Sequence, residues 1–431
     1  MDLLVHPCPS IQNEIEVPGD KSISHRSVLF SAIADGISEI QNFLPGADCL
    51  HTVNCVRQLG IEVEELSSDA LRVHGKGLHG LSEPVDVLNV GNSGTTIRLL
   101  TGLLAGQDFY TVLTGDESIR RRPMGRVVKP LRQMGAAIWG RKDAQLAPLA
   151  IAGNPLRGMH HQIPVASAQL KSALLLAGLY ADKETAVTEP AFSRDHTENM
   201  LQALGAKIQR SGRTAVIQPA PLLKAQKILV PGDISSAAFF LVAGAIVPGS
   251  KVTIKQVGIN PTRTGILDAL DMMGAHITIS NRHTSAGEAI GDITIEHRDL
   301  HGIELGGDLV PRLIDEIPIL AVAATAAEGQ TIIRNAEELK IKESNRLQST
   351  ARELSRFGVK IQETQDGLII EGGRGYTGTV CSSHGDHRIA MSCAIMALTA
   401  QGPTRIRNVE CIDISFPGFA DTLQRISGQG N

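Results

Sequence analysis

A short pattern recurs five times along the chain, each time at the end of a segment with a helix-like pattern. In each copy a glycine follows a long apolar residue, and residues of alternating polarity come next. A glycine there suits a helix C-terminus in the left-handed conformation, and the alternation suits a strand. One copy would be ordinary helix punctuation, but five copies, spaced 69 to 84 residues apart, predict repeated helix–strand units. The copies are LGIEV at 59–63, MGAAI at 134–138, LGAKI at 204–208, MGAHI at 273–277 and FGVKI at 357–361.

A second repetition divides the chain into two related halves. The letters VPGD stand at 17–20 and again at 230–233, each time ahead of hydroxyl residues and an apolar run. We expect three units in each half, the last one ending in a helix-like stretch at 419–426 with no strand after it. Helices are expected inside each half because three stretches are apolar on nearly all sides. These stretches are 172–179, 236–247 and 317–327.

Composition narrows the class of protein. A chain of 431 residues with 42% hydrophobic residues is too long for one ordinary core, which favours two domains. A net charge of -4 argues against a nucleic-acid binder with a broad basic face. The scattered cysteines contain no CxxC pair, so a reducing cytoplasm is expected. Neither a signal peptide nor an apolar stretch of membrane-spanning length is present in the sequence, and no membrane association is expected.

Cations stand where a helix is expected to begin. In VPGDKSISHR, residues 17–26, Lys21 and Arg26 precede or open an apolar run. A helix N-terminus already carries partial positive charge, so cations there are unfavourable unless an anion offsets them. The stretch therefore predicts a receptor for a negatively charged ligand, and the chain's overall negative charge requires that receptor to be local.

Two further stretches fit an anion site. GNSGTTIRLL at 91–100 resembles a phosphate-binding turn, in which Gly91 and Gly94 let backbone N–H groups approach an oxyanion and Arg98 adds charge. It lacks the Walker spacing, so nucleotide hydrolysis is not predicted. In the basic run at 120–129, the residue before Pro123 is held extended, which gives Arg122 a preset direction. The other cations of this run are expected to be solvated.

Five later motifs place charged or hydroxyl groups beside apolar helices. Each has a plain structural reading as helix capping, a favourable acid at a helix start or a structural histidine. Lys342 and Arg346 would share one face if that segment is helical, and like charges there repel unless an anion sits between them. No second histidine stands at metal-ligand spacing, and no metal is expected. The motifs contain Ser167, Gln169 and Lys171; Ser193 and Arg194; Asp315 and Glu316; Lys342, Glu343 and Arg346; and Asp386, His387 and Arg388.

Taken together, these motifs resemble the 5-enolpyruvylshikimate-3-phosphate (EPSP) synthase family, in the branch with divergent substrate-site sequences. The resemblance implies an α+β fold of two similar globular domains, each made of three βαβαββ units with buried helices in an inside-out α/β barrel. It implies a discontinuous domain of 1–20 with 229–431 and a continuous domain of 21–228, closing over the substrates. The matching stretches are PGDKSISHR, GNSGTTIRL, RRRPM, SAQLKSAL, IDEIPIL, IKESNRL and DHRIAM, in family order.

The resemblance also implies an activity. The family transfers the enolpyruvyl group of phosphoenolpyruvate to the 5-hydroxyl of shikimate 3-phosphate and releases phosphate, in the shikimate pathway of aromatic amino-acid biosynthesis. Both substrates carry a phosphate and a carboxylate, which accounts for the cations. We expect a cytoplasmic monomer that needs no cofactor, binds no nucleic acid and is inhibited by the phosphoenolpyruvate mimic glyphosate.

Residue roles follow from the resemblance. Asp315 and Glu343, assisted by Lys21, would handle protons, and which residue moves which proton stays open. Shikimate 3-phosphate would be held by Ser22, Arg26, Ser167, Ala168, Gln169, Ser193, Arg194, Asp315 and Lys342. Phosphoenolpyruvate would be held by Lys21, Asn92, Gly94, Thr95, Arg122, Gln169, Arg346, His387 and Arg388.

One position departs from the family and two alternatives remain. Some relatives carry a lysine where Ile414 stands before Ser415, which puts one phosphoenolpyruvate contact in doubt. The first alternative is the sister enzyme that acts on UDP-N-acetylglucosamine; its catalytic loop normally carries a cysteine, and 115–131 has none. The second is a non-catalytic binder of polyanions or RNA ends, for which Asp315 and Glu343 would be a disadvantage.

Overall fold

The chain folds into two compact units. The computed structural model describes residues 1–373 and 375–428. Unit 1 comprises 1–18, 232–283 and the described residues from 289 onward, and unit 2 comprises 19–231 with 284–288. The short segment 284–288 lies within the range assigned to the discontinuous domain from sequence, but it packs with unit 2. It does so because Glu288 accepts a hydrogen bond from Asn199, and Ser285 accepts one from the N–H of Leu229.

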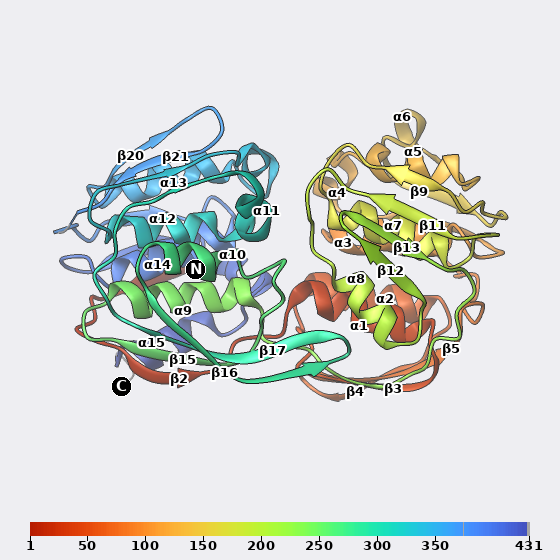
Figure 1. The fold of residues 1–431 in the computed structure, drawn as a ribbon, viewed down its shortest axis with the longest axis horizontal. Coiled ribbons are helices and arrows are strands. Elements are labelled where there is room, and N and C mark those ends of the chain that lie inside the picture. Colours follow the sequence, from red (N-terminus) through yellow and green to blue (C-terminus); the bar gives the residue numbers. More distant parts are fainter. Residues whose placement is uncertain (374, 429–431) are drawn as a thin grey trace. The chain divides into compact units, whose positions relative to one another are not determined.

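Three small sheets form unit 2 in the described part of the chain (Figure 1). In each sheet the first strand is parallel to the second, and the remaining neighbours are antiparallel. The same pairing in every sheet is what a repeated βαβαββ unit produces. In sheet order the strands are β14 (Lys227–Leu229), β3 (Asp35–Gln41), β5 (Ala70–Lys76) and β4 (Val63–Ser67); β6 (Leu88–Asn89), β7 (Tyr110–Thr114), β9 (Leu146–Ala152) and β8 (Ala137–Gly140); and β10 (His160–Gln162), β11 (Thr185–Thr188), β13 (Thr214–Ile217) and β12 (Ile208–Ser211).

Unit 1 repeats this plan, again with three sheets among its described residues. Its last sheet has three strands. The final repeat supplies only the first two strands of the pattern, and the N-terminal strand β1 (Asp2–Val5) takes the position of the third. In sheet order the strands are β2 (Gln12–Ile15), β15 (Lys251–Gly258), β17 (Glu288–Glu296) and β16 (His276–Ser285); β18 (Glu304–Leu305), β19 (Gln330–Ile333), β21 (Leu368–Glu371) and β20 (Lys360–Glu363); and β22 (Val380–Ser382), β23 (Thr404–Arg407) and β1 (Asp2–Val5).

Apolar helices fill the interior of each unit, as predicted. Every residue of α9 and of α12 is buried, and α7 is buried from Leu170 onward. In unit 1, α9, α12 and α14 contact one another and lie side by side inside the sheets (Figure 1). The helices of unit 2 are α1 (Lys21–Ala32), α2 (Ala47–Gln58), α3 (Gly94–Leu104), α4 (Glu117–Arg121), α5 (Gly125–Gln133), α6 (Arg141–Ala144), α7 (Ala168–Gly178) and α8 (His196–Ala203). Those of unit 1 are α9 (Ile234–Ile246), α10 (Gly265–Met272), α11 (Val310–Leu313), α12 (Ile317–Thr325), α13 (Arg346–Arg356), α14 (His387–Ala397) and α15 (Phe419–Ser427).

The repeated glycines end helices in the predicted conformation. Their φ angles lie between 84° and 112°, in the region that a glycine adopts without steric cost. Each is followed within a few residues by a strand, namely β4, β8, β12, β16 or β20. These glycines are Gly60, Gly135, Gly205, Gly274 and Gly358.

The two VPGD stretches begin equivalent helices. The Asp20 side chain accepts a hydrogen bond from the N–H of Ile23 at the start of α1, and the Asp233 side chain accepts one from Ser235 at the start of α9. An aspartate at this N-cap position satisfies a backbone donor that would otherwise lack a partner. The echo in the sequence therefore marks one local structure used once in each unit.

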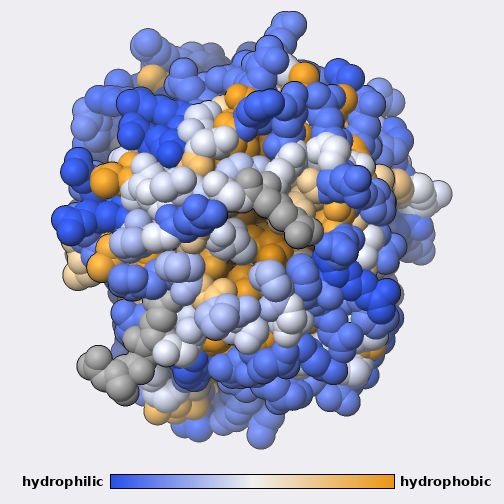
Figure 2. Space-filling view, turned by 90° about the vertical axis from the view of Figure 1, so that its left-hand side faces the viewer, coloured by the Kyte–Doolittle hydropathy of each residue, from blue (hydrophilic) through white to orange (hydrophobic). Residues whose placement is uncertain are grey.

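One face of unit 1 is mostly polar. Figure 2 shows one face of this unit, on which hydrophilic residues surround a smaller hydrophobic area. Within the described residues no helix is long and apolar enough to cross a bilayer. The apolar helices of the sequence are therefore accounted for by the cores of the two units.

Candidate active site

The first cationic motif opens helix α1. The ammonium of Lys21 lies 2.5 Å from a carboxylate oxygen of Asp48 on α2, and the Lys21 side chain is 28% exposed. Burial would raise the pKa of Asp48, but Lys21 lowers it below its ordinary value. A cation at a helix start thus has a fixed carboxylate partner and still reaches the surface.

Arg26 lies deeper in unit 2. Its Nε donates to the hydroxyl of Thr197 at 2.8 Å, its Nη2 to the hydroxyl of Ser172 at 2.8 Å, and its Nη1 to the backbone oxygen of Ser22 at 2.9 Å. Burial lowers the pKa of Arg26 to about 10, which leaves the guanidinium charged at neutral pH. Arg26 is 3% exposed. Its hydrogen bonds join α1, α7 and α8.

The glycine-rich turn and the arginine-rich stretch meet at the start of α3. Ser93 caps this helix, and Gly94 is its first residue. A Cβ atom at Gly94 would lie 2.9 Å from Nη1 of Arg98 and 3.1 Å from Nη1 of Arg122. Arg122 has the extended backbone predicted for a residue before proline, and its Nη2 donates to Oδ1 of Asn92 at 2.9 Å. Two guanidinium groups therefore converge on a helix N-terminus that has no side chain in the way.

The other cations of that stretch confirm the prediction that they are solvated. They lie on the surface of unit 2, and only Arg122 is partly buried. The exposed residues are Arg120, Arg121, Arg126 and Lys129.

Gln169 connects α7 to the same place. Its amide nitrogen donates to the hydroxyl of Thr95 at 3.0 Å, and its amide oxygen accepts from Nη1 of Arg98 at 2.6 Å. Ser167 caps α7, as the structural reading of that residue predicted, and Ala168 is the first residue of the helix. The site residues predicted on α3 and α7 thus come together, because the two helices pack closely in the core of unit 2.

Ser193 and Arg194 lie in the loop before α8, and both are partly buried. The Ser193 hydroxyl donates to Oε1 of Glu189, the buried residue that follows β11. Within unit 2, therefore, the predicted residues gather at the N-terminal ends of α1, α3, α7 and α8.

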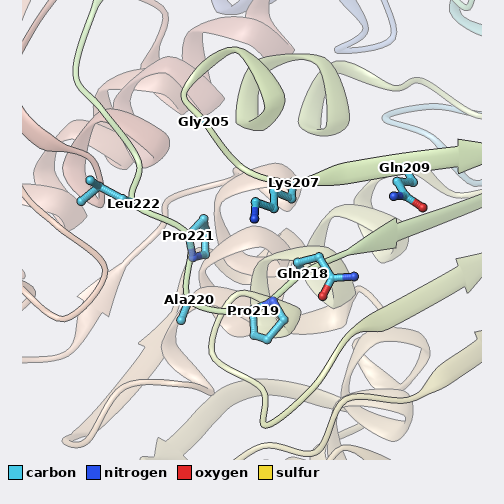
Figure 3. Close-up of a pocket in the computed structure, with 8 residues that line it drawn as sticks. All are labelled: Gly205, Lys207, Gln209, Gln218, Pro219, Ala220, Pro221 and Leu222. Atoms are coloured by element: carbon cyan, nitrogen blue, oxygen red, sulfur yellow. The ribbon is translucent and has the colours of Figure 1, made fainter.

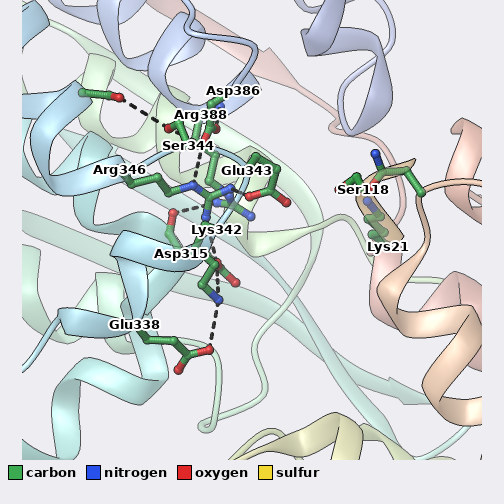
Figure 4. A network of polar contacts seen from close by, with 12 residues as sticks. Lys21, Ser118, Asp315, Glu338, Lys342, Glu343, Ser344, Arg346, Asp386 and Arg388 are labelled. Carbon is green, nitrogen blue, oxygen red and sulfur yellow. Dashed lines mark hydrogen bonds and ion pairs between the residues drawn. The ribbon is translucent and has the colours of Figure 1, made fainter. Parts of the chain in front are cut away.

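In unit 1 the predicted residues gather around Arg346, the first residue of α13 (Figure 4). Its guanidinium is almost fully buried and binds three carboxylates at once. Nη1 lies 3.1 Å from Asp315, Nη2 lies 2.5 Å from Glu343 and Nε lies 2.8 Å from Asp386. Burial lowers the pKa of Arg346, but these acids raise it above its ordinary value. The two acids predicted to handle protons therefore share one cation.

Lys342 also belongs to this cluster, but its backbone is not helical. It does not lie on a helix, because its backbone is extended (φ -82°, ψ -154°) and α13 begins only at Arg346. The condition for a shared helical face, a helix that includes both residues, is therefore not met. The ammonium of Lys342 still lies 3.7 Å from the Asp315 oxygen that Arg346 contacts. The anion that offsets the repulsion between these two cations is a side chain of the protein itself.

The protonation states of this cluster follow from burial and charge. Burial would raise the pKa of Glu343, but Arg346 and then His387 lower it to about 2. Burial, with further repulsion from Arg388 and Arg346, lowers the pKa of His387 to about 3. At neutral pH Glu343 is thus an anion and His387 is neutral.

Arg388, on the first turn of α14, is held at its guanidinium. Nη1 donates to the backbone oxygen of Asp315 at 2.9 Å and lies 3.3 Å from Oε1 of Glu316. Glu316 is fully buried in the short turn that leads into α12, and its Oε1 also accepts from the hydroxyl of Ser235. Arg388 keeps 13% of its side chain exposed.

Two other features of unit 2 do not involve the predicted residues. A hollow of about 670 Å³ is lined by Gly205, Lys207, Gln209, Gln218, Pro219, Ala220, Pro221 and Leu222 (Figure 3), with a single cation among them. Ligand atoms of Glu62, Glu64 and His74 lie within 4.8 Å of one another. Glu64 already binds Arg72 and His74, which leaves this surface group poorly suited to a metal ion.

Several contributing residues were given no role in the site from the sequence. Asp48, Glu189 and Glu198 pair with cations of the site region, and Asp386 and Glu316 hold its arginines. Glu198 and Asp386 stand inside stretches singled out from sequence: Glu198 lies four residues after Arg194, and Asp386 directly precedes His387. Asp48 lies 27 positions after Lys21, and nothing in the sequence indicates that pair.

Comparisons with known proteins agree across the whole chain. The family model described as EPSP synthase (3-phosphoshikimate 1-carboxyvinyltransferase) matches residues 5–423. Curated proteins named 3-phosphoshikimate 1-carboxyvinyltransferase from Desulforudis audaxviator and Desulforamulus reducens are 55% and 54% identical over 426 residues, covering 99% of both chains in each case. A solved structure of EPSP synthase from Acinetobacter baumannii matches with a TM-score of 0.92 and 44% identity, covering 99% of this chain and 98% of that one.

Proposed function

Because this chain belongs to the EPSP synthase family and is a 3-phosphoshikimate 1-carboxyvinyltransferase, we propose that the cations and carboxylates described above bind its two substrates and move the protons of the reaction. The enzyme transfers the enolpyruvyl group of phosphoenolpyruvate to the 5-hydroxyl of shikimate 3-phosphate and releases phosphate. The residue roles that follow are our proposal.

The addition step needs two proton transfers, the elimination step needs a third, and neither step forms a covalent bond to the enzyme. The 5-hydroxyl loses its proton as its oxygen bonds to C2 of phosphoenolpyruvate, and C3 gains a proton and becomes a methyl group. The resulting tetrahedral intermediate then loses phosphate, and C3 returns a proton as the double bond forms again. One group must accept a proton and one must deliver it, in the manner of general acid–base catalysis.

The observation that carries the proposal is the shared guanidinium of Arg346. It holds Asp315 and Glu343 at 3.1 Å and 2.5 Å, so both acids have a fixed cationic partner before any substrate binds. A substrate anion that binds Arg346 competes with these acids for its charge. Losing that partner raises the pKa of an acid, which turns an anion into a proton donor. Substrate binding would therefore prepare the proton transfer.

The cations of the site offset the negative charge of the two substrates. Two like unit charges 4 Å apart near a protein surface repel by about 4 kcal/mol, and each substrate carries both a phosphate and a carboxylate. Cations fixed in advance offset this repulsion and hold the reacting atoms in place. We assign phosphoenolpyruvate to Lys21, Asn92, Gly94, Thr95, Arg122, Gln169, Arg346, His387 and Arg388. We assign shikimate 3-phosphate to Ser22, Arg26, Ser167, Ala168, Gln169, Ser193, Arg194, Asp315 and Lys342.

The test is phosphate release with each possible acceptor. We expect turnover with phosphoenolpyruvate and shikimate 3-phosphate, and none with UDP-N-acetylglucosamine. Arg346→Met should bind phosphoenolpyruvate weakly and lose most turnover, because it removes the cation that the two acids share. As a matched control, Arg126→Met on the exposed surface should leave kcat and KM unchanged. An Arg346→Met enzyme with native kinetics would remove the basis of the assignment.

We further propose that the enzyme works in the cytoplasm as a monomer, without a nucleic-acid partner. The cysteines, of which Cys8, Cys49, Cys55, Cys381 and Cys393 are buried, are free thiols, which supports a reducing compartment. Light scattering coupled to size exclusion checks the oligomeric state, and a mass near 45.9 kDa is expected.

A further inference from the structure

Lys171 is a cation buried in unit 2, next to the predicted site residues but not among them. It lies on α7, one helical turn after Ser167, and is 3% exposed. Its ammonium lies 2.7 Å from Oε2 of Glu189 and 2.8 Å from Oε1 of Glu198. Both carboxylates are themselves more than nine-tenths buried. Burying a cation between two buried acids costs desolvation energy, so such a cluster suggests a role for Lys171 beyond packing.

Each acid is linked, by a hydrogen bond or by its neighbour in the chain, to a residue that we assign to shikimate 3-phosphate. The second oxygen of Glu189 accepts the hydroxyl hydrogen of Ser193. Glu198 follows Thr197, whose hydroxyl accepts from Nε of Arg26. One ammonium thus lies behind both the Ser193 loop and the Arg26 guanidinium.

The helix that carries Lys171 also contacts Arg26 directly. Ser172, the next residue of α7, accepts from Nη2 of Arg26 at 2.8 Å, and its hydroxyl lies 2.6 Å from that of Thr197. The α7 helix, the α8 helix and the loop before α8 are therefore joined through buried polar groups. Such a network fixes side-chain positions more firmly than isolated contacts do.

The charges of Glu189 and Glu198 keep Lys171 protonated. Burial lowers the pKa of Lys171, but Glu198 and then Glu189 raise it, so the ammonium keeps its charge. Oε2 of Glu198 has no hydrogen-bond partner among the described residues. Without Lys171, Glu189 and Glu198 would both lose the cation that they share, behind a loop that we assign to a phosphorylated substrate.

We propose that Lys171 is a positioning residue that sets the affinity of the enzyme for shikimate 3-phosphate, acting through Glu189 on Ser193 and through Glu198 on Arg26. The proposal rests on the assignment of Ser193 and Arg26 to that substrate. The ammonium of Lys171 is already held by Glu189 and Glu198, so it acts on the ligand through these two acids. It holds Glu189 in place, which orients the Ser193 hydroxyl, and it cancels negative charge that would repel the phosphate.

The first test removes the charge and keeps the length of the side chain. Lys171→Met should weaken equilibrium binding of shikimate 3-phosphate, measured by calorimetry without phosphoenolpyruvate, by about tenfold or more. The KM for phosphoenolpyruvate should change less than about twofold, since none of its assigned residues contacts Lys171. The matched control is Lys183→Met, in the exposed turn after α7, which should bind as the native enzyme does.

A second variant separates positioning from general stability. Lys171→Met with Glu198→Gln restores the net charge of the cluster but leaves Glu189 without its anchor. We expect its melting temperature to return toward the native value while binding of shikimate 3-phosphate stays weak. Recovery of both together would show that Lys171 only stabilises the fold and would overturn the proposal. This variant also serves if Lys171→Met alone does not fold.

A conservative variant and the native enzyme complete the design. Lys171→Arg keeps the charge and should recover part of the lost affinity, and affinity as poor as that of Lys171→Met would argue against a role for the charge. Native binding by Lys171→Met would also overturn the proposal. If the native enzyme itself failed to bind shikimate 3-phosphate, the assigned function would be wrong instead, so the two failures are distinguishable.

Discussion

The carboxylate of Asp315 accepts a hydrogen bond of 3.1 Å from the guanidinium of Arg346, which lies 31 positions later in the chain. The same carboxylate oxygen lies 3.7 Å from the ammonium of Lys342. Two cations assigned to anionic substrates therefore share a carboxylate of the enzyme. Under this assignment we expect ligand binding to be an exchange of anions, in which the substrates replace the enzyme's own acids as partners of Lys342 and Arg346.

Glu343→Gln tests whether that acid takes part in chemistry. We expect kcat to fall by about 10²- to 10⁴-fold, the range for loss of a general acid or base, while KM for either substrate changes far less. Phosphate release under saturating substrates measures the effect. The matched control is Glu337→Gln, an exposed residue for which no loss is expected. Equal losses in kcat and in substrate affinity would mean that Glu343 only positions groups.

The lowered pKa of Glu343 predicts a pH dependence of stability. The folded enzyme holds this pKa at about 2, against an ordinary value of 4.5. The ion pair with Arg346 therefore stabilises the fold above about pH 4.5, and that contribution disappears as the pH falls toward 2. The effect is reduced by solvent, since the side chain is 40% exposed.

Thermal unfolding of the native enzyme and of Glu343→Gln over this pH range isolates the contribution of one residue. The native enzyme should be the more stable at pH 6, and the difference should shrink steadily below pH 4.5. A difference that is constant with pH would contradict the lowered pKa.

The sequence predicted local structure well because the relevant signals are local. The glycines of the five repeats ended helices as expected, and Arg122 was extended because proline follows it. The α+β fold of buried helices in repeated units was also confirmed, by the sheets and by the solved EPSP synthase structure.

The residues that support the site could not be predicted in this way. The sequence left open whether Lys342 lies on a helix, because the charges at 342 and 346 suit a helical face and only the observed backbone shows that α13 starts later. The partners of Lys171 lie 18 and 27 residues further along the chain, on elements brought together by packing. Such pairs depend on tertiary structure, for which one sequence carries no signal.

Gly94→Ala is expected to weaken inhibition by glyphosate. The added Cβ would approach Nη1 of Arg98 and of Arg122 to 2.9 Å and 3.1 Å, so both guanidinium groups must shift. We expect millimolar glyphosate to inhibit the native enzyme in competition with phosphoenolpyruvate. The alanine variant should need several-fold more inhibitor and show a raised KM for phosphoenolpyruvate, with the KM for shikimate 3-phosphate as internal control. An unchanged native rate in millimolar glyphosate would refute the first expectation.

Gly102→Ala, on the same helix, should instead damage the fold. A Cβ at this position would lie 2.2 Å from the backbone oxygen of Ala173 and 2.7 Å from its Cα, at the crossing of α3 and α7. The clash is with backbone, so no side chain can turn away, and the two helices must separate. Overpacking of a core costs about 1–3 kcal/mol and more where the backbone must move.

The comparison with Gly94→Ala makes this prediction specific. Both substitutions add one methyl group to α3, but at Gly94 the methyl group meets only the flexible ends of arginine side chains. We therefore expect thermal unfolding to show a small change for Gly94→Ala and a loss of several degrees for Gly102→Ala. Because α3 carries Thr95 and Arg98 and α7 carries Gln169, separating the helices should also break the hydrogen bonds of Gln169 and raise the KM for phosphoenolpyruvate. If Gly102→Ala melted and turned over like the native enzyme, close packing of these helices would not be what holds Gln169 against Arg98.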